Sequence, residues 1–245
     1  MTAVSADPTS ARWRAVSSEF GIAALRHTHW LDTEPRTYDG TPGTWAARDG
    51  AIIGSIPEHA AEHVLRPGEA IRVGQLELRA FSRDGALALR VIDPDAPSRR
   101  RLRGILSYPR QSDWVLHGTF EPASDGETRV VRSVDGHERT EVAVGVVALS
   151  LPGEKVRLTV SAGASGLQAV IADATSGDDA YRFRFLPIDA PNADGEVTVD
   201  FNRAYLPPCA FSDQYVCPLP PAGNRLSVRI EAGERLPDVT EGENR

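Results

Sequence analysis

The stretch from Asp200 to Leu226 brings together side chains that can act on a carbonyl compound. Within six residues it holds the carboxyl of Asp200, the guanidinium of Arg203 and the phenol of Tyr205. A carboxylate accepts protons, a phenol donates to a developing oxyanion, and a planar guanidinium holds a carboxylate or enolate oxygen. Earlier in the chain His29 adds an imidazole, the group best suited to moving protons near neutral pH. In the predicted acid/base catalysis on a carbonyl-bearing metabolite, His29 or Asp200 moves protons and the other two side chains bind oxygen atoms.

Each of these side chains also has a structural interpretation. A histidine such as His29 can donate to a backbone carbonyl and serve only the fold. Asp200 precedes Arg203 by three residues, which fits an ion pair that braces the following segment. Asp200 and Asn202 fall on the polar face of a predicted strand. They are either solvated or, in a barrel with a polar lumen, line a cavity near Tyr205.

Further positions are candidate substrate contacts. They are Trp30, Asp173, Thr175, Asn202, Arg203 and Arg225. The run 173–177 reads Asp-Ala-Thr-Ser-Gly and fits either a ligand-contacting loop or a turn whose side chains bond local backbone amides. Asn224 and Arg225 either tie down the end of the proline-rich stretch by hydrogen bonds or contact the substrate.

Other chemistries find no support in the sequence. It has no Gly-x-Ser-x-Gly elbow, no phosphate-cradling loop and no dinucleotide fingerprint. His59 and His63 are four apart, but Glu62 is misplaced for a zinc-hydrolase helix. Cys209 and Cys217 lack metal-ligand spacing, so buried thiols, a disulfide and a metal or redox role all stay open. We therefore expect a site without metal or cofactor.

Composition restricts the partners. The chain has 245 residues and a net charge of −7, which argues against a nucleic-acid partner because such a surface needs a basic face. No apolar run reaches the roughly 18 residues of a membrane span, and the N-terminus lacks the regions of a signal peptide. We expect a cytoplasmic protein with a small-molecule ligand. The sequence gives no indication of its oligomeric state.

The spacing of apolar residues predicts a mainly β protein. From Trp45 onward the apolar period is two, and turn residues interrupt it every eight to fifteen positions, as in an antiparallel β-sandwich or barrel. Thr9 or Ser10 can cap a helix from Ala11 to about His27. The stretch 200–226 contains five prolines and forms a rigid C-terminal excursion rather than a strand.

The expected elements and boundaries follow from this pattern. One or two helical turns are expected within 57–64. Strands are expected at 51–53, 70–73, 76–80, 87–91, 114–120, 127–132, 139–151, 155–162, 166–172, 181–186, 197–201 and 226–231. A flexible arm at 1–10 and a flexible tail at 237–245 flank a single β domain at 11–236, with a soft break near 103–113.

Several motifs carry a resemblance to a known family. They are 173–177, 200–205 running into 207–211, 217–221 and 224–226, with weaker landmarks at 29–31, 42–45, 91–97 and 120–122. The chain resembles a prokaryotic family catalogued as domain of unknown function 1684, and the weaker landmarks are similar to its actinobacterial members. The segments 20–27 and 182–185 depart from the family pattern. The resemblance implies no particular reaction, so it supports the predicted fold and the location of the site only.

Two functions fit these observations. The first is a small-molecule-binding β protein that acts as a cofactor-independent lyase, isomerase or cyclase, by dehydration, isomerisation or cyclisation of its ligand. The alternative is a non-catalytic ligand- or protein-binding module with a structural proline-rich motif. An enzyme needs a concave pocket where at least two of the named polar groups converge. A binding module needs those groups to be held apart or tied to the backbone.

Overall fold

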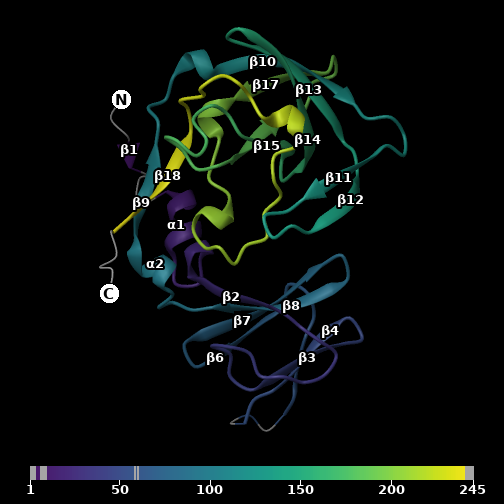
Figure 1. Ribbon diagram of the computed structural model, residues 1–245, viewed down its shortest axis with the longest axis vertical. Coiled ribbons are helices and arrows are strands. Elements are labelled where there is room, and N and C mark those ends of the chain that lie inside the picture. The colour runs from purple at the N-terminus through teal and green to yellow at the C-terminus, as the bar shows by residue number, and fades with distance from the viewer. Residues whose placement is uncertain (1–3, 6–9, 58, 60, 241–245) are drawn as a thin grey trace. The chain divides into compact units, whose positions relative to one another are not determined.

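The computed structural model describes residues 4–5, 10–57, 59 and 61–240, which are mainly β (Figure 1). The chain forms two compact units. Unit 1 contains Arg103–Ala210 and Val216–Asp238, and unit 2 contains most residues up to Leu102 together with Phe211–Tyr215. The boundary between Leu102 and Arg103 falls at the start of the expected soft break. The single domain predicted for 11–236 stays a prediction.

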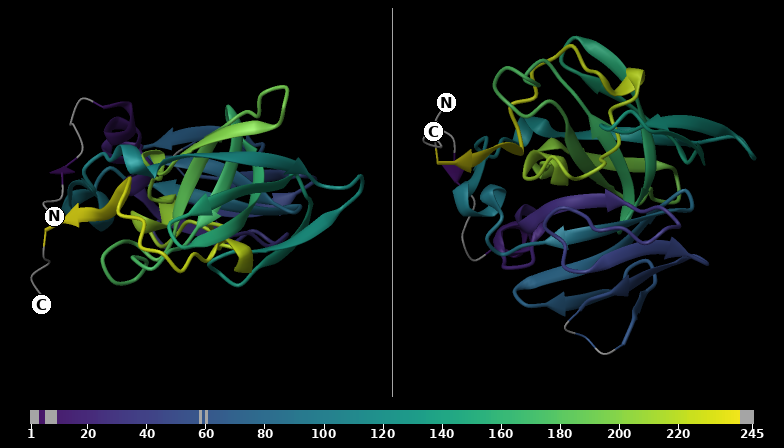
Figure 2. Two further views of the ribbon diagram at one scale, coloured as in Figure 1. Left: turned by 90° about the horizontal axis from the view of Figure 1, so that it is seen from above. Right: turned by 60° about the horizontal axis from the view of Figure 1, so that its bottom comes forward.

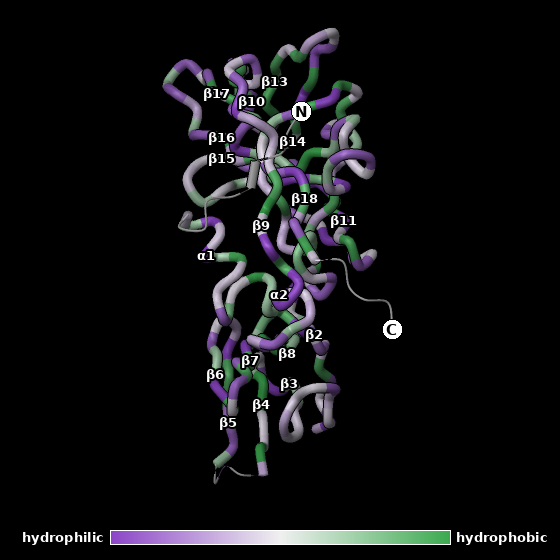
Figure 3. Tube along the Cα trace, turned by 90° about the vertical axis from the view of Figure 1, so that its left-hand side faces the viewer, coloured by the Kyte–Doolittle hydropathy of each residue, from purple (hydrophilic) through white to green (hydrophobic). Residues whose placement is uncertain are grey.

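Unit 1 is built on a nearly closed antiparallel barrel (Figure 2). Its strands follow the order β16-β15-β14-β13-β10-β17, and β16 lies beside β17. The six strands are β10 (Val115–Pro122), β13 (Gly145–Leu151), β14 (Glu154–Gly163), β15 (Gly166–Ile171), β16 (Arg184–Asp189) and β17 (Glu196–Asp200). Alternate side chains such as Val147, Leu158 and Ile171 are buried in one core. The predicted antiparallel β class is therefore confirmed, and Figure 3 shows polar and apolar residues interspersed along the strands.

Two smaller sheets complete unit 1. One is the hairpin of β11 (Thr128–Arg132) and β12 (Glu138–Val142), and the other has the order β1-β9-β18, from Val4–Ser5, Leu102–Ser107 and Glu234–Val239. The single strand expected at 139–151 is thus wrong, because the chain breaks before Gly145. Gly145 has φ 150°, and a Cβ there would lie 2.3 Å from the carbonyl oxygen of Glu121.

The C-terminal part of unit 1 differs from the prediction. The residues 226–231 form no strand, because the Arg184 guanidinium hydrogen-bonds to the carbonyl oxygens of Ile230 and Ala232. A strand, β18, follows instead and includes residues 237–239, which were expected in the tail. Most of the arm expected at 1–10 lies outside the described residues. The part of the expected tail beyond Thr240 also lies outside them.

Unit 2 contains two antiparallel sheets. The first has the order β2-β8-β7-β6 and the second the order β3-β4-β5. Their strands are β2 (Leu25–Trp30), β3 (Thr44–Arg48), β4 (Ala51–Ser55), β5 (His63–Leu65), β6 (Ala70–Val73), β7 (Leu76–Arg83) and β8 (Ala86–Ile92), and a short helix α2 spans Pro97–Arg101. The described residues of 57–64 form no helix, so the helical turns expected there are wrong.

The N-terminal helix is shorter than expected. Helix α1 spans Ala11–Ser17 and is capped by Ser10, whose side chain accepts from the Trp13 amide at 3.1 Å. It ends because Ser18 leaves the helical region with ψ 163°. After a 3-10 turn the chain enters β2 at Leu25, whose pairing with β8 overrides the helical pattern.

The proline-rich excursion forms short 3-10 turns instead of a strand, as expected. These turns are Phe201–Arg203, Pro208–Ala210 and Ala222–Asn224. Single bridges connect its unit 1 residues to other segments of that unit, for example Pro218 to Ser133. Among the described residues, no helix has the length and apolar character needed to cross a membrane.

Candidate functional site

A groove of about 690 Å³ lies on the outer surface of the unit 1 barrel. Strands β14 and β15 form its floor, the β11–β12 hairpin forms one wall, and the residues 218–221 form its roof. In Figure 1 these three segments come from distant parts of the chain. We call this cavity the barrel groove.

The side chains on the floor of the barrel groove are those that point outward from β14 and β15, because successive side chains of a strand point to opposite faces. Leu158 and Ala169 point into the barrel core, so their neighbours Thr159 and Gln168 point outward. Ser161 and Val170 lie on the same outward face. The floor therefore offers hydroxyl and amide groups beside an apolar side chain.

The hairpin wall carries charged side chains. Glu141 accepts from Arg129 at 2.6 Å and from Arg139 at 2.9 Å, so one carboxylate serves two guanidinium groups. Arg132 pairs with Glu138 at the exposed end of the hairpin. The Arg129–Glu141–Arg139 cluster thus leaves one positive charge in excess.

The roof is apolar and rigid. It consists of Pro218, Leu219, Pro220 and Pro221. The Leu219 amide donates to the Arg132 carbonyl at 2.8 Å, which attaches the roof to the end of β11. Proline fixes φ and has no amide proton, so the remaining roof residues expose few donors. An apolar ligand surface can therefore pack here without leaving amides unsatisfied.

Asn224 fastens the end of the roof to the floor. Its buried side chain accepts from the Thr159 amide at 2.7 Å and donates to the carbonyls of Thr159 and Val170 at 2.9 Å. The prediction that Asn224 ties down the excursion is confirmed. The next residue, Arg225, lines the barrel groove, and no acceptor among the described residues pairs with its guanidinium. Of the predicted substrate contacts, Arg225 is the one placed in this cavity.

We expect Asn224→Ala to lower the free energy of unfolding by about 2 kcal/mol or more, because buried groups of β14 and β15 lose their partner. Asn192 is the matched control, since it also makes three hydrogen bonds but is exposed. Water can replace those bonds, so Asn192→Ala should change stability by less than about 1 kcal/mol. Urea denaturation of both variants measures the difference, and equal losses would contradict this role of Asn224.

Asp200 is held by two other side chains. It accepts from the Asn202 side chain at 2.8 Å and from Arg110 at 2.9 Å. Burial acts to raise the pKa of Asp200, but the hydrogen bonds from Asn202 and Arg110 outweigh it and lower the pKa below its ordinary value. The ion pair expected with Arg203 is wrong, because Arg203 pairs with Asp189 at 2.7 Å.

Asn202 and Tyr205 also have protein partners. Asn202 accepts from the Gln111 amide at 2.9 Å and donates to the Gln111 carbonyl at 2.8 Å, so it holds a loop in place. Tyr205 donates to the Gln168 side chain at 3.0 Å and packs edge-on against Phe185. Tyr205 therefore contacts a floor residue of the barrel groove without being a lining residue itself.

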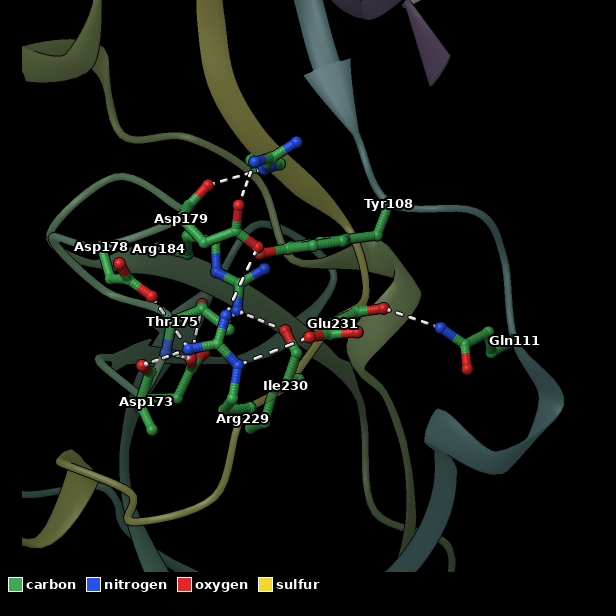
Figure 4. A network of polar contacts seen from close by, with 12 residues as sticks. Tyr108, Gln111, Asp173, Thr175, Asp178, Asp179, Arg184, Arg229, Ile230 and Glu231 are labelled. Carbon is green, nitrogen blue, oxygen red and sulfur yellow. Dashed lines mark hydrogen bonds and ion pairs between the residues drawn. The ribbon is translucent and has the colours of Figure 1, made fainter. Parts of the chain in front are cut away.

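Asp173 and Thr175 lie in a buried polar network (Figure 4). Asp173 accepts from the Thr175 amide at 2.7 Å and from its hydroxyl at 2.6 Å, which confirms the predicted turn. Asp173 also forms an ion pair with Arg184, whose side chain is fully buried. Nearby, Arg229 bonds to Asp178 at 3.0 Å. This arrangement gives Asp173 and Thr175 a bracing role.

His29 and Trp30 belong to unit 2, so we assign them no shared role with the residues of unit 1. His29 Nε2 donates to the Asp39 carbonyl at 2.9 Å, and its ring stacks on His27. This contact matches the structural interpretation of His29. Trp30 is about one-third exposed, and the Arg83 guanidinium lies 4.6 Å from its ring centroid.

Most lining residues of the barrel groove were not among the candidate positions that the sequence indicated. The missed polar lining residues are Arg129, Arg132, Glu138, Arg139, Glu141, Thr159, Ser161 and Gln168. Their signal is weak, because polar residues that alternate with core residues are also typical of solvated strands. Among the described residues, no cluster of three or more His, Cys, Asp or Glu side chains is arranged to hold a metal ion.

Comparison with known proteins gives the family. Residues 100–235 match the family described as "Protein of unknown function (DUF1684)". The chain belongs to this family. It is also similar to an uncharacterized protein of Haloarcula marismortui solved by solution NMR, with 31% identity, a TM-score of 0.44, and coverage of 54% of this chain and 76% of that one. No curated protein matches the chain.

Proposed function

We propose that this protein binds a small molecule with an apolar body and an acidic group, and that the barrel groove is the binding site. The observation that carries this proposal is the Arg225 guanidinium, which lines a cavity of about 690 Å³ and has no acceptor among the residues that the structure describes. Small-molecule sites typically have volumes of about 300–1,000 Å³, with mostly apolar walls and a few polar groups that fix orientation. A carboxylate suits Arg225 because a planar guanidinium can donate two parallel hydrogen bonds to it.

The other groove residues support this ligand chemistry. Leu219 and the neighbouring prolines offer a surface for an apolar body. Thr159, Ser161 and Gln168 can orient a carbonyl or hydroxyl oxygen from the floor. The surplus positive charge beside Glu141 further favours an anion over a cation. A carbonyl-bearing metabolite with a carboxylate combines these features.

Binding is better supported than catalysis. Asp200 is occupied by Asn202 and Arg110, and the Tyr205 hydroxyl is bonded to Gln168. Neither group is a lining residue of the barrel groove, whereas acid/base chemistry needs both to reach one substrate. A dehydration, isomerisation or cyclisation at this site stays a prediction. The cytoplasmic location and the similarity to actinobacterial members of the family also stay predictions.

A protein-binding role has weaker support. It would use Val130 and Val142, which are exposed on the β11–β12 hairpin. Two valines form a smaller patch than the few hundred Å² that usually mark a partner surface. The small-molecule proposal is therefore preferred.

The fluorescence of 8-anilinonaphthalene-1-sulfonate, an apolar anion, tests the proposal. The folded protein should give a saturable one-site increase that decanoate reverses and decyltrimethylammonium does not. Val170→Trp should abolish the increase by filling the floor, whereas Lys155→Trp, on the same face of β14 but outside the groove, should not. No saturable signal, or equal displacement by the cation, would refute the proposal.

A further inference from the structure

Cys209 and Cys217 belong to unit 1, lie within the proline-rich excursion before and after the segment Phe211–Tyr215, and form no disulfide. Cys209 is in the turn Pro208–Ala210, and Cys217 directly precedes the groove roof. Both are buried, with 7% and 6% of their surface exposed. The Cys217 thiol donates a hydrogen bond to the Cys209 sulfur. The two sulfur atoms are therefore neighbours, as the formation of a disulfide requires.

Hydrogen-bond donors surround the Cys209 sulfur. The Tyr181 hydroxyl donates to the Cys209 carbonyl at 2.9 Å and lies 3.7 Å from its Sγ. The Arg182 guanidinium also interacts with this thiol. The hydrogen bond from Cys217, together with Tyr181 and Arg182, outweighs burial and lowers the pKa of Cys209 to about 7. Burial and the contact with Cys209 raise the pKa of Tyr181 to about 12, so its hydroxyl remains a donor.

These surroundings differ from those of an inert buried cysteine. A thiol in an apolar pocket is held in its protonated form, whereas nearby cationic and hydroxyl donors favour the reactive thiolate. Among the described residues, no third ligand joins the two sulfurs in a group that could hold a metal. The second thiol next to the first is the arrangement typical of redox-active pairs.

We propose that Cys209 is a site of oxidation by hydroperoxides and that Cys217 resolves the product to a reversible intramolecular disulfide. The Cys209 thiolate attacks one oxygen of hydrogen peroxide, the O–O bond breaks, and the released hydroxide takes up a proton to become water. The resulting sulfenic acid is attacked by the Cys217 sulfur, its S–O bond breaks, and a second water leaves as the disulfide forms. The two thiols together lose two electrons, and the peroxide is reduced to two waters.

Intact-protein mass spectrometry after treatment with hydrogen peroxide tests this proposal. The wild type should lose two hydrogen atoms and both thiols, and dithiothreitol should restore them. In Cys217→Ser, oxidation of Cys209 should stop at a sulfenic acid, which a 1,3-dione traps. Cys209→Ser should react with peroxide at least about tenfold more slowly than the wild type, because an ordinary thiol is less than about a tenth ionised at neutral pH. An unchanged mass, or oxygen addition without disulfide in the wild type, would overturn the proposal.

The pH dependence of alkylation by iodoacetamide checks the role of the donors. The alkylation rate of Cys209 should rise with pH as the thiolate forms, both in the wild type and in Cys217→Ser. In the wild type the midpoint of this rise should lie near pH 7. Arg182→Gln should move this midpoint to higher pH, and a midpoint near pH 8 would make the reaction at about pH 7 roughly fivefold slower. A midpoint of the wild type at or above that of an ordinary thiol would show that Cys209 is not activated.

Discussion

Replacing Arg184 with methionine is expected to lower the free energy of unfolding by about 3–5 kcal/mol. The fully buried guanidinium pairs with Asp173 and donates to the carbonyls of Ile230 and Glu234. Methionine fills much of the volume but leaves a buried carboxylate without its partner. Urea denaturation followed by circular dichroism measures the loss.

An exposed pair of the same chemistry provides the control. Arg203 and Asp189 lie 2.7 Å apart, but both side chains are more than one-third exposed. Water solvates Asp189 once its partner is removed, so Arg203→Met should change stability by less than about 1 kcal/mol. If Arg184→Met and Arg203→Met cost the same, burial would not be the reason for the strength of the Asp173–Arg184 pair.

Arg225→Gln is expected to weaken the binding of decanoate about 10- to 100-fold, because a hydrogen bond to a charged group contributes about 1.5–3 kcal/mol. Glutamine can still donate, but it carries no charge. The affinity for the uncharged decanol should change little. Competition with the anilinonaphthalene dye measures both dissociation constants.

Arg157→Gln is the control for this variant. Arg157 lies on β14 outside the barrel groove and pairs with Glu121 at 2.7 Å. Its replacement should leave both affinities unchanged. A loss for decanol equal to that for decanoate in Arg225→Gln would show that Arg225 shapes the cavity instead of binding the anion.

Local sequence signals were sufficient for much of the fold. The dipeptide Asp84-Gly85 stands between the strands expected at 76–80 and 87–91 and favours a two-residue hairpin turn. Strands β7 and β8 pair as that hairpin, and both turn residues have positive φ, of 49° and 84°. The cap at Ser10 was likewise recognisable. Turns and caps depend on a few consecutive residues, so the sequence contains most of the information that determines them.

Tertiary contacts decided the features that the sequence did not predict. The pairing of Leu25 with Ile92 ends the helical pattern. In the segment 226–231, the Ile230 carbonyl accepts from the side chain of Arg184, which is distant in the sequence, instead of from a neighbouring strand. The barrel groove combines segments about 90 residues apart, so only Arg225, next to a recognisable motif, could be predicted as part of it. Side chains that looked catalytic, such as Asp200, are bound by partners that no local pattern indicates.

The most direct test is a titration of the ¹⁵N-labelled protein with decanoate, followed by two-dimensional NMR. The barrel groove predicts the largest shift changes at the backbone amides of Ser161, Gln168 and Leu219, with saturation at one equivalent and no such changes in Val170→Trp. Shift changes concentrated around His29 and Trp30, or no saturable change at all, would contradict the account that this protein binds its ligand in the barrel groove.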